Sequence, residues 1–383
     1  MDDLHKRARR RLAAFYGDRG RVAALTCVVT DSPATDIHHL DESGKAGNWG
    51  LQNTIPLRSD LNQAIERRQI QNWPRELYPE HLEAQSKWHF DRARFPQAYG
   101  CARLGSFLLM PWRAEAVPHI GVNPDGALHF CALALRCLRP LSELPLAIDV
   151  LSRSAVRALE ATRVRVEPMT IAETLHEIGS FLIETGYPAD AMAFLRESDH
   201  QVARVQTTEA MWLRSRTLQR RALCFLATGD TARFRRALTR ATPLAEVGAY
   251  ANGDATRLTW ESRAELLGDR PDLERAIDLA DSVAGDRRAT LWTRAEAMIT
   301  TAQAYFVMER EPLAYDILRE VSDLQRLTQI SPTAILDVPI VELCRWRYPQ
   351  LLWTNARQRA PQHVEAFKGV ARDLLERVVI HRT

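Results

Sequence analysis

The sequence predicts a mainly α-helical protein that begins with a small strand–strand–helix unit. Two observations lead to this fold class. In the second half of the chain, turn signals recur at regular intervals, and amphipathic segments lie between them. Near the N-terminus, two short stretches rich in apolar and β-branched residues precede a polar loop and a helix-start signal.

The composition of the 383 residues is ordinary for a globular protein. Hydrophobic residues make up 46% of the chain and charged residues 26%, which is ample apolar material for a core. The net charge is only +3, so the chain as a whole is not a polybasic nucleic-acid binder. Any contact with nucleic acid must therefore depend on local basic clusters.

The six cysteines are scattered and form no C-x-x-C pair. This argues against a zinc ribbon and a disulfide framework, and it fits a reducing compartment. The N-terminus is charged and lacks an apolar signal core, and no run of about eighteen apolar residues occurs. We therefore expect a cytoplasmic protein with no membrane partner.

The first elements are predicted from local signals. Apolar and β-branched runs indicate strands, Gly-rich and Pro-containing stretches indicate loops, and Ser59 or Asp60 is a plausible helix N-cap. The expected order is a helix over 2–16, a buried strand over 22–30, a second strand over 35–40, a loop over 41–50, an irregular segment over 51–57 and a helix from about 59 to 71.

Residues 73–168 are expected to be mostly helical and interrupted by prolines, with a clear break at 118–125. An amphipathic helix is predicted over 171–184 and a second helix over 189–197. Turn signals then follow one another at spacings of 43, 39 and 42 residues, which indicates a stack of helical hairpins. The turns lie at Gly186, Gly229-Asp230, Gly268-Asp269 and Arg310-Glu311-Pro312.

The segment Gly186-Tyr187-Pro188-Ala189-Asp190-Ala191 resembles the turn and second helix of tetratricopeptide repeats (TPR). The match is loose, because the period exceeds the usual ~34 residues and the full consensus is absent. Residues 338–382 are expected to add a last helical pair that closes the end of the stack. The predicted domains are a head over 1–75, a helical connection over 76–168 and a TPR-like repeat domain over 169–383.

One pattern near the N-terminus points to chemistry. Asp36-Ile37-His38-His39 lies in the second predicted strand, Asn53 follows His39 by 14 positions, and Asn62 follows it by 23. Phosphodiester hydrolysis needs a base to activate water and a cation to hold the phosphate. Imidazole is a good base near neutral pH, and oxygen or imidazole ligands suit divalent cations.

This pattern resembles the HNH (ββα-metal) endonuclease family, and in particular the HNH domain of RNA-guided CRISPR nucleases. There, Asp-x-Asp-His is followed by Asn and then by Ser-Asp-x-Asn. The match covers about residues 21–68. It departs from many family members in lacking the cysteine pairs that bind a structural zinc ion, since Cys27 stands alone near the first such position.

The resemblance implies a role for each matching residue. His39 would be the general base, and Asn53 would tie the loop to the strands through backbone hydrogen bonds. His38 and Asn62 would be metal ligands with Asp36 as a supporting partner, and Glu66 is a weaker ligand candidate. The implied cofactor is a divalent metal ion, Mg²⁺ first, with Mn²⁺ or Ni²⁺ as alternatives.

Basic residues beside this pattern are candidates for contact with nucleic-acid phosphates, or alternatively form solvated helix faces. These candidates are Arg58, Arg67, Arg68, Arg10 and Arg11. Three tryptophans could stack on bases, but core packing is the favoured interpretation: Trp73, Trp88 and Trp112. Four histidines without ligand spacing are interpreted as ordinary residues: His81, His89, His119 and His129.

These observations predict a metal-dependent HNH endonuclease that cuts DNA. The fused helical repeats would sense a signal, bind a protein partner or self-associate, an architecture that resembles bacterial anti-phage systems. One alternative is a non-catalytic repeat protein whose degenerate HNH module only grips nucleic acid. A second alternative is a nuclease that cuts RNA.

Overall fold

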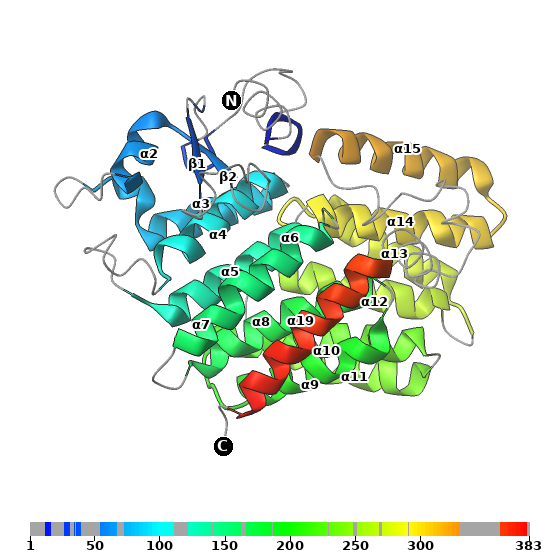
Figure 1. Cartoon of the computed structure of the whole chain (residues 1–383). Helices are drawn as coiled ribbons and strands as arrows, with labels where there is room; N and C mark the ends of the chain where they lie inside the picture. Colours follow the sequence, from blue (N-terminus) through cyan, green and yellow to red (C-terminus); the bar gives the residue numbers. More distant parts are fainter. Residues whose placement is uncertain are drawn as a thin grey trace.

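The computed structural model describes most of the chain, and the remainder is drawn as a grey trace in Figure 1. The described part is mainly α-helical and contains a two-stranded antiparallel sheet near the N-terminus. It comprises residues 12–16, 27–30, 34, 36–39, 54–66, 73–92, 94–110, 122–139, 141, 143–161, 166–185, 187–228, 230–247, 251–267, 270–289, 291–328 and 361–380.

The sheet pairs β1 (Asp36–His39) with β2 (Thr54–Leu57). Asp36 lies opposite Leu57, and His39 lies opposite Thr54. The helix α2 (Ser59–Glu66) begins two residues after β2 and contacts β1. Two paired strands and a helix are present, but the strands are not the predicted pair, because β1 pairs with a later segment instead of an earlier one.

The strand predicted over 22–30 is wrong in its described part, because Val28–Thr30 form a turn. Val28 is fully buried, its amide donates to the carbonyl of Pro56 (3.2 Å), and its own carbonyl accepts from Cys101 Sγ (2.9 Å). These residues are therefore apolar because they are buried between the sheet and a helix. A buried turn and a buried strand favour the same residue types, so β-propensity alone does not distinguish them.

The irregular segment predicted over 51–57 is also wrong, because Thr54–Leu57 form β2. Pro56 had argued against a strand, since proline cannot donate to a β-ladder. In a two-stranded sheet both strands are edge strands. A proline is tolerated in an edge strand where its nitrogen needs no partner in the ladder. Pro56 lies opposite Ile37, and its carbonyl is used by Val28.

The connecting region is helical, as predicted. Several of its prolines begin helices rather than break them, because the first turn of a helix needs no proline N–H. Arg103 and Asp149 form a buried ion pair of 2.7 Å across this layer. The elements are η2 (Arg75–Leu77), α3 (Pro79–Asp91), α4 (Phe95–Leu108), α5 (Pro124–Leu138), α6 (Leu144–Asp149), the π-helical η4 (Val150–Ala155) and α7 (Val156–Ala161).

Four helical hairpins follow, and the predicted repeat is confirmed. Their first helices begin at residues 168, 208, 251 and 291, and the two helices of each pair lie on either side of a predicted turn. The hairpins are α8 (Pro168–Glu184) with α9 (Pro188–Val202), α10 (Thr208–Ala227) with α11 (Thr231–Val247), α12 (Ala251–Leu267) with α13 (Leu273–Gly285), and α14 (Leu291–Val307) with α15 (Glu311–Thr328).

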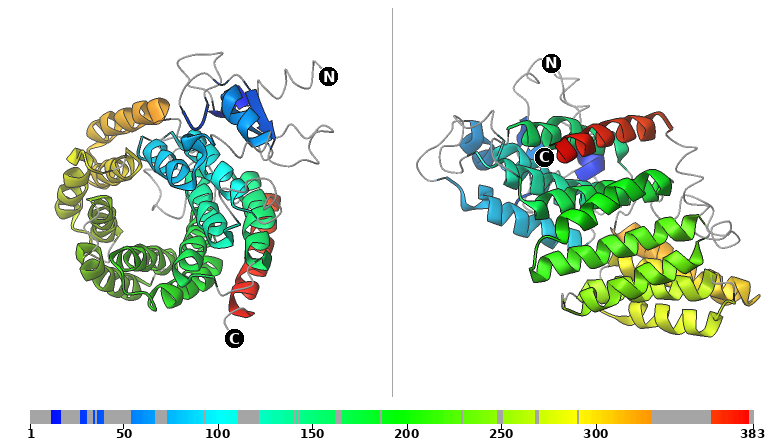
Figure 2. Two further views of the ribbon diagram at one scale, coloured as in Figure 1. Left: turned by 90° about the vertical axis from the view of Figure 1, so that its left-hand side faces the viewer. Right: turned by 90° about the horizontal axis from the view of Figure 1, so that it is seen from below.

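The hairpins stack along a curved path (Figure 2). Consecutive first helices contact one another, so α8, α10, α12 and α14 form a continuous layer that we call the inner layer. Within a hairpin the packing is close: a Cβ on Gly179 of α8 would lie 2.7 Å from Cγ of Leu195 in α9. The curve brings α15 back to the side of the molecule that carries β1 and β2 (Figures 1 and 2).

The C-terminal helix α19 (Pro361–Ile380) does not close the end of the stack, which corrects the described part of the prediction for 338–382; residues 338–360 lie outside the described residues. It packs instead on α6, η4, α7 and α8, far from α15 (Figure 1). Phe367 is fully buried, with its ring 5.3 Å from that of Phe181, and Lys368 and Arg372 both pair with Asp190. The apolar face of α19 is satisfied by these helices rather than by the last hairpin.

One cluster of buried apolar side chains extends from Leu12 to Val378. It includes Ile55 and Leu61 of the head together with side chains of the connecting helices, the first hairpins and α19. The head is therefore built onto the helical stack. None of the helices among the described residues combines the length and the apolar content needed to cross a bilayer.

Candidate functional site

The predicted catalytic pattern maps onto the head. β1 carries three of its residues, Asp36, His38 and His39, with His38 opposite Ile55 in the sheet. Asn62 lies on α2, and its side chain is only 3% exposed, on the same helix as the buried Leu61. The structure thus brings the strand and the helix of the pattern into contact. Asn53, Arg10, Arg11, Arg67 and Arg68 lie outside the described residues.

Arg58, a predicted phosphate contact, is held by neighbouring acids. Its Nε and Nη2 donate to the two carboxylate oxygens of Asp60 at 2.6 and 2.7 Å, and Glu76 lies 3.6 Å away. The hydrogen bond from Arg58 lowers the pKa of Asp60 below its usual range. This bidentate pair stands at the start of α2, and Arg58 remains about one-third exposed (37%).

The predicted metal ligands are not tested by this geometry. Within the part of the chain whose side chains are described, no three histidine, cysteine or acidic side chains are grouped closely enough to hold a metal ion. The β1 side chains lie outside that part. The metal site therefore stays a prediction.

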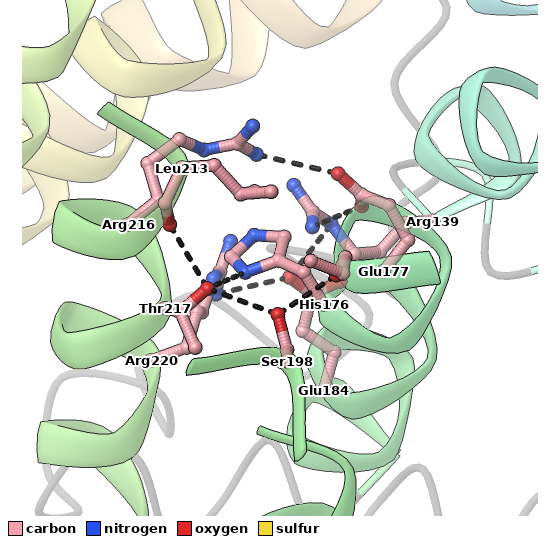
Figure 3. A network of polar contacts seen from close by, with 10 residues as sticks. Arg139, His176, Glu177, Glu184, Ser198, Leu213, Arg216, Thr217 and Arg220 are labelled. Carbon is pink, nitrogen blue, oxygen red and sulfur yellow. Dashed lines mark hydrogen bonds and ion pairs between the residues drawn. The ribbon is translucent and has the colours of Figure 1, made fainter. Parts of the chain in front are cut away.

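A second polar site, which the sequence did not indicate, lies on the inner layer (Figure 3). Arg139, at the end of α5, is 6% exposed and pairs with Glu177 at 2.8 Å and with Glu184 at 3.1 Å. From α10, Arg216 approaches Glu177 at 3.4 Å and Arg220 approaches Glu184 at 3.3 Å. Two acids on α8 are thus shared among three arginines.

Further members extend this group along the inner layer. Arg263 of α12 is 1% exposed and lies 3.8 Å from Glu296 of α14. Arg136, on the last turn of α5, acts on both Arg216 and Glu177 through their charges. We call this group the arginine–glutamate cluster, made of Arg136, Arg139, Arg216, Arg220, Arg263, Glu177, Glu184 and Glu296.

His176 responds to the electrostatic potential of this cluster. It is fully buried, and its Nδ1 lies 3.0 Å from Oγ1 of Thr217, which also approaches Ser198 (Figure 3). Burial lowers the pKa of His176 well below its usual value, and the neighbouring arginines, Arg216 first, lower it further. The buried ring of His176 is therefore neutral at neutral pH, and the nearby guanidinium groups favour the same state.

His129, interpreted from the sequence as an ordinary residue, contacts two glutamates from different helices. Its Nδ1 lies 2.8 Å from Glu173 of α8, and its Nε2 lies 3.2 Å from Glu83 of α3. Burial favours the neutral ring, but the hydrogen bonds to Glu173 and Glu83 outweigh it and raise the pKa of His129 to about 9. The protonated ring therefore joins α3, α5 and α8 at neutral pH.

Trp73 and His89 are packing residues, whereas Trp88 is exposed. Trp73 belongs to the core, as predicted, at 8% exposure. Trp88 is 39% exposed instead, and the guanidinium of Arg92 lies 4.1 Å from its ring centroid. His89 is buried and bonds to the carbonyl of Val28 at 3.1 Å, which is a structural role.

Sequence spacing could have suggested parts of the arginine–glutamate cluster. Glu177 and Glu184 lie seven residues apart, and Arg216 and Arg220 lie four apart, so each pair shares one helix face. The two glutamates interrupt the otherwise apolar sequence of α8. Nothing in the sequence, however, pairs α8 with α10 or adds residues from α5 and α14.

Comparison with known proteins gives similarity of fold alone. No protein-family model matches the chain, and no curated protein matches it. Two crystal structures of a kinesin light chain candidate from Podosopora anserina with nearly identical TPR-like repeats, one of them a point variant, are each 18% identical with a TM-score of 0.37. They cover 54% and 55% of this chain, and 98% and 99% of their own.

A Rap protein complexed with Competence and Sporulation Factor is 12% identical, covers 78% of this chain and 76% of its own, and has a TM-score of 0.49. These structures share the helical character of the described residues. The stacked hairpins of this chain are established by the contacts between its own helices.

Proposed function

We propose that this protein is a metal-dependent HNH endonuclease that hydrolyses DNA phosphodiester bonds. The observation that carries the proposal is the arrangement of residues 36–39 and 54–66. The strand with His38 and His39 pairs antiparallel with β2, and α2 with Asn62 follows at once and contacts that strand. Two paired strands followed by a helix support the resemblance to HNH nucleases.

In this proposal His39 takes the proton from the attacking water, since imidazole accepts protons near neutral pH. His38 and Asn62 would hold the divalent metal ion, Mg²⁺ first, with Asp36 supporting the site. When bound, the ion would supply the positive charge that stabilises the phosphate and the leaving oxygen. Asn53 would hold the loop between the strands.

The helical stack is proposed to control this activity. Its curved layer of hairpins presents a large surface to a protein partner, a signal or a second copy of the chain. A nuclease joined to such a sensor suits defence against phage in the cytoplasm. This biological role rests on architecture alone.

The test is cleavage of supercoiled plasmid with Mg²⁺ or Mn²⁺, with and without EDTA. Wild type is compared with His39→Ala and with His81→Ala, a control histidine on α3 outside the pattern. We expect His39→Ala to lose about 10²-fold or more of the cleavage rate, the usual contribution of a general base. Equal cleavage by all three proteins would remove His39 from the mechanism. A parallel assay on labelled RNA decides between the two substrates.

The alternative is a non-catalytic repeat protein whose head only grips nucleic acid. The 3% exposure of Asn62 favours it, because a metal ligand must reach an ion that substrate can approach. Calorimetric titration with Mg²⁺, Mn²⁺ and Ni²⁺ separates the two functions. Binding that is lost in His38→Ala supports the nuclease, and the absence of binding in wild type supports the alternative.

A further inference from the structure

The arginine–glutamate cluster contains more positive than negative charge. Five guanidinium groups meet three carboxylates, and each carboxylate is already paired with at least one arginine. Two positive charges are therefore left over within the cluster. Buried charges are costly unless an opposite charge compensates them, so an excess of this kind needs an explanation.

The excess is concentrated around Arg136 and Arg216. Arg136 forms no ion pair with a described residue; its guanidinium lies 4.4 Å from the ring centroid of Phe90, and its Nε makes no hydrogen bond. Burial, and then the charge of Arg136, lower the pKa of Arg216 to about 9, so Arg216 stays protonated at neutral pH. Like charges are thus held together by the fold.

A buried indole N–H in the same region also lacks a partner among the described residues. Trp260, 3% exposed, has a free Nε1–H, and its ring faces Arg263 and Arg220 at 4.4 and 5.8 Å. Buried polar atoms of native proteins are nearly always hydrogen-bonded, so an unused donor beside surplus cations indicates a site for an acceptor.

We propose that the arginine–glutamate cluster binds the phosphate group of a small ligand on the inner layer. A phosphate group carries about two negative charges near neutral pH, which matches the surplus, and guanidinium forks bind its oxygens in pairs. The site can be reached, since Arg216, Arg220 and Glu184 keep side-chain exposures of 15%, 12% and 23%. Free phosphate and a phosphate monoester share this chemistry.

A nucleic-acid backbone fits the site less well. Backbone binding uses a row of exposed cations that each neutralise a phosphate along an extended path. The arginines of this cluster are recessed instead, and four of the five pair with glutamates that would repel a polyanion. This inference does not depend on the proposed nuclease activity.

Thermal unfolding and calorimetry of the full chain test the site. The probes are inorganic phosphate and adenosine monophosphate, with chloride at equal ionic strength as the blank. We expect phosphate or the monoester to raise the Tm of wild type. Stronger binding of the monoester identifies an ester ligand, and equal binding identifies free phosphate.

Two variants locate the binding. Arg136→Gln and Arg216→Gln should each weaken binding by about tenfold or more, whereas Arg233→Gln, an exposed arginine of α11, should leave it unchanged. Without ligand, Arg136→Gln should unfold at the same or a higher temperature than wild type, because it relieves repulsion. A purely structural arginine would lower the Tm instead.

Several results would overturn the proposal. No Tm shift in wild type with either phosphate probe would do so, as would an equal shift in Arg136→Gln and wild type. Binding of an acidic peptide or of DNA in place of both phosphate probes would assign the cluster to a different class of ligand.

Discussion

The head and the arginine–glutamate cluster hold their polar residues in opposite ways. The head gathers its candidate residues from one stretch, residues 36–62, and folds them as neighbouring elements. The cluster gathers its residues from α5, α8, α10, α12 and α14, between residues 136 and 296. A local pattern can be recognised in the sequence, because the spacing of its residues largely determines where their elements place them. A site built from several helices forms only when the hairpins stack.

The two regions also differ in how they are stabilised. Two strands of four residues and one helix of eight bury too little surface to fold alone, so the head depends on Val28, Ile55 and Leu61 joining the shared core. The cluster is part of the stack's own packing. Substitutions in the cluster should therefore change stability, and substitutions in the head should change chemistry.

The largest effect on stability is expected from Arg139→Ala. It leaves Glu177 and Glu184 buried beside fewer cations, and breaking a buried ion pair by removing one partner costs about 3–5 kcal/mol. Urea unfolding measures the loss. The matched control is Arg319→Ala, which removes an exposed pair with Asp316 and should cost under about 1 kcal/mol. Similar values for both variants would mean that the cluster is not a stabilising unit.

Phe367→Ala tests a contact between segments far apart in the chain. It removes a fully buried ring that joins α19 to Phe181 of α8, and truncations of this kind cost about 3 kcal/mol or more. We expect α19 to become sensitive to proteolysis while the hairpins remain folded. Val379→Ala, on the exposed side of the same helix, is the control, and protection equal to wild type in Phe367→Ala would contradict this packing.

His129→Gln should cost about 1–2 kcal/mol, with a defined pH dependence. The pKa of His129 is raised to about 9 in the folded state, so its stabilisation is complete below its unfolded value of 6.5 and fades as the pH rises through 9. The hydrogen bond from His129 is the main cause that lowers the pKa of Glu83 to about 2. The stability that the ionised Glu83 contributes is therefore lost as the pH falls from 4.5 toward 2.

Urea unfolding of wild type and His129→Gln at pH 5.5 and at pH 9.5 measures this dependence. The difference between the two proteins should be largest at pH 5.5 and small at pH 9.5. The exposed His200 provides the control variant, His200→Gln. A difference that grows with pH would show that the ring is not protonated in its contact with the two glutamates.

The smallest effect is expected from Arg58→Gln in the head. Because Arg58 is already held by Asp60, we expect DNA affinity to fall only a few-fold and stability to change by under about 1 kcal/mol. Filter binding at two salt concentrations gives both the affinity and the salt slope. A loss of a hundredfold or more would show that Arg58 leaves Asp60 to bind phosphate.

Sequence patterns predicted the helical hairpins well and the strands poorly. Each hairpin repeats an apolar face with its own turn, so its period survives in the sequence, and the first helices begin at 168, 208, 251 and 291. The run around Val28 was predicted to be a strand because a turn buried between other elements contains the same apolar and β-branched residues as a strand. Pro56 argued against a strand, but a proline is tolerated in an edge strand, and the sequence does not show which strands are edges.

By itself, the sequence determined the helical class, the hairpin period, the strand that carries His38 and His39 and the helix that carries Asn62, because these depend on residues close together in the chain. The tertiary structure decided which segment pairs with that strand, where α19 packs, that His129 joins two glutamates, and that five arginines crowd around three acids. Most of these contacts join residues tens to hundreds of positions apart. Their energies come from burial and charge, which exist only when the layers are assembled.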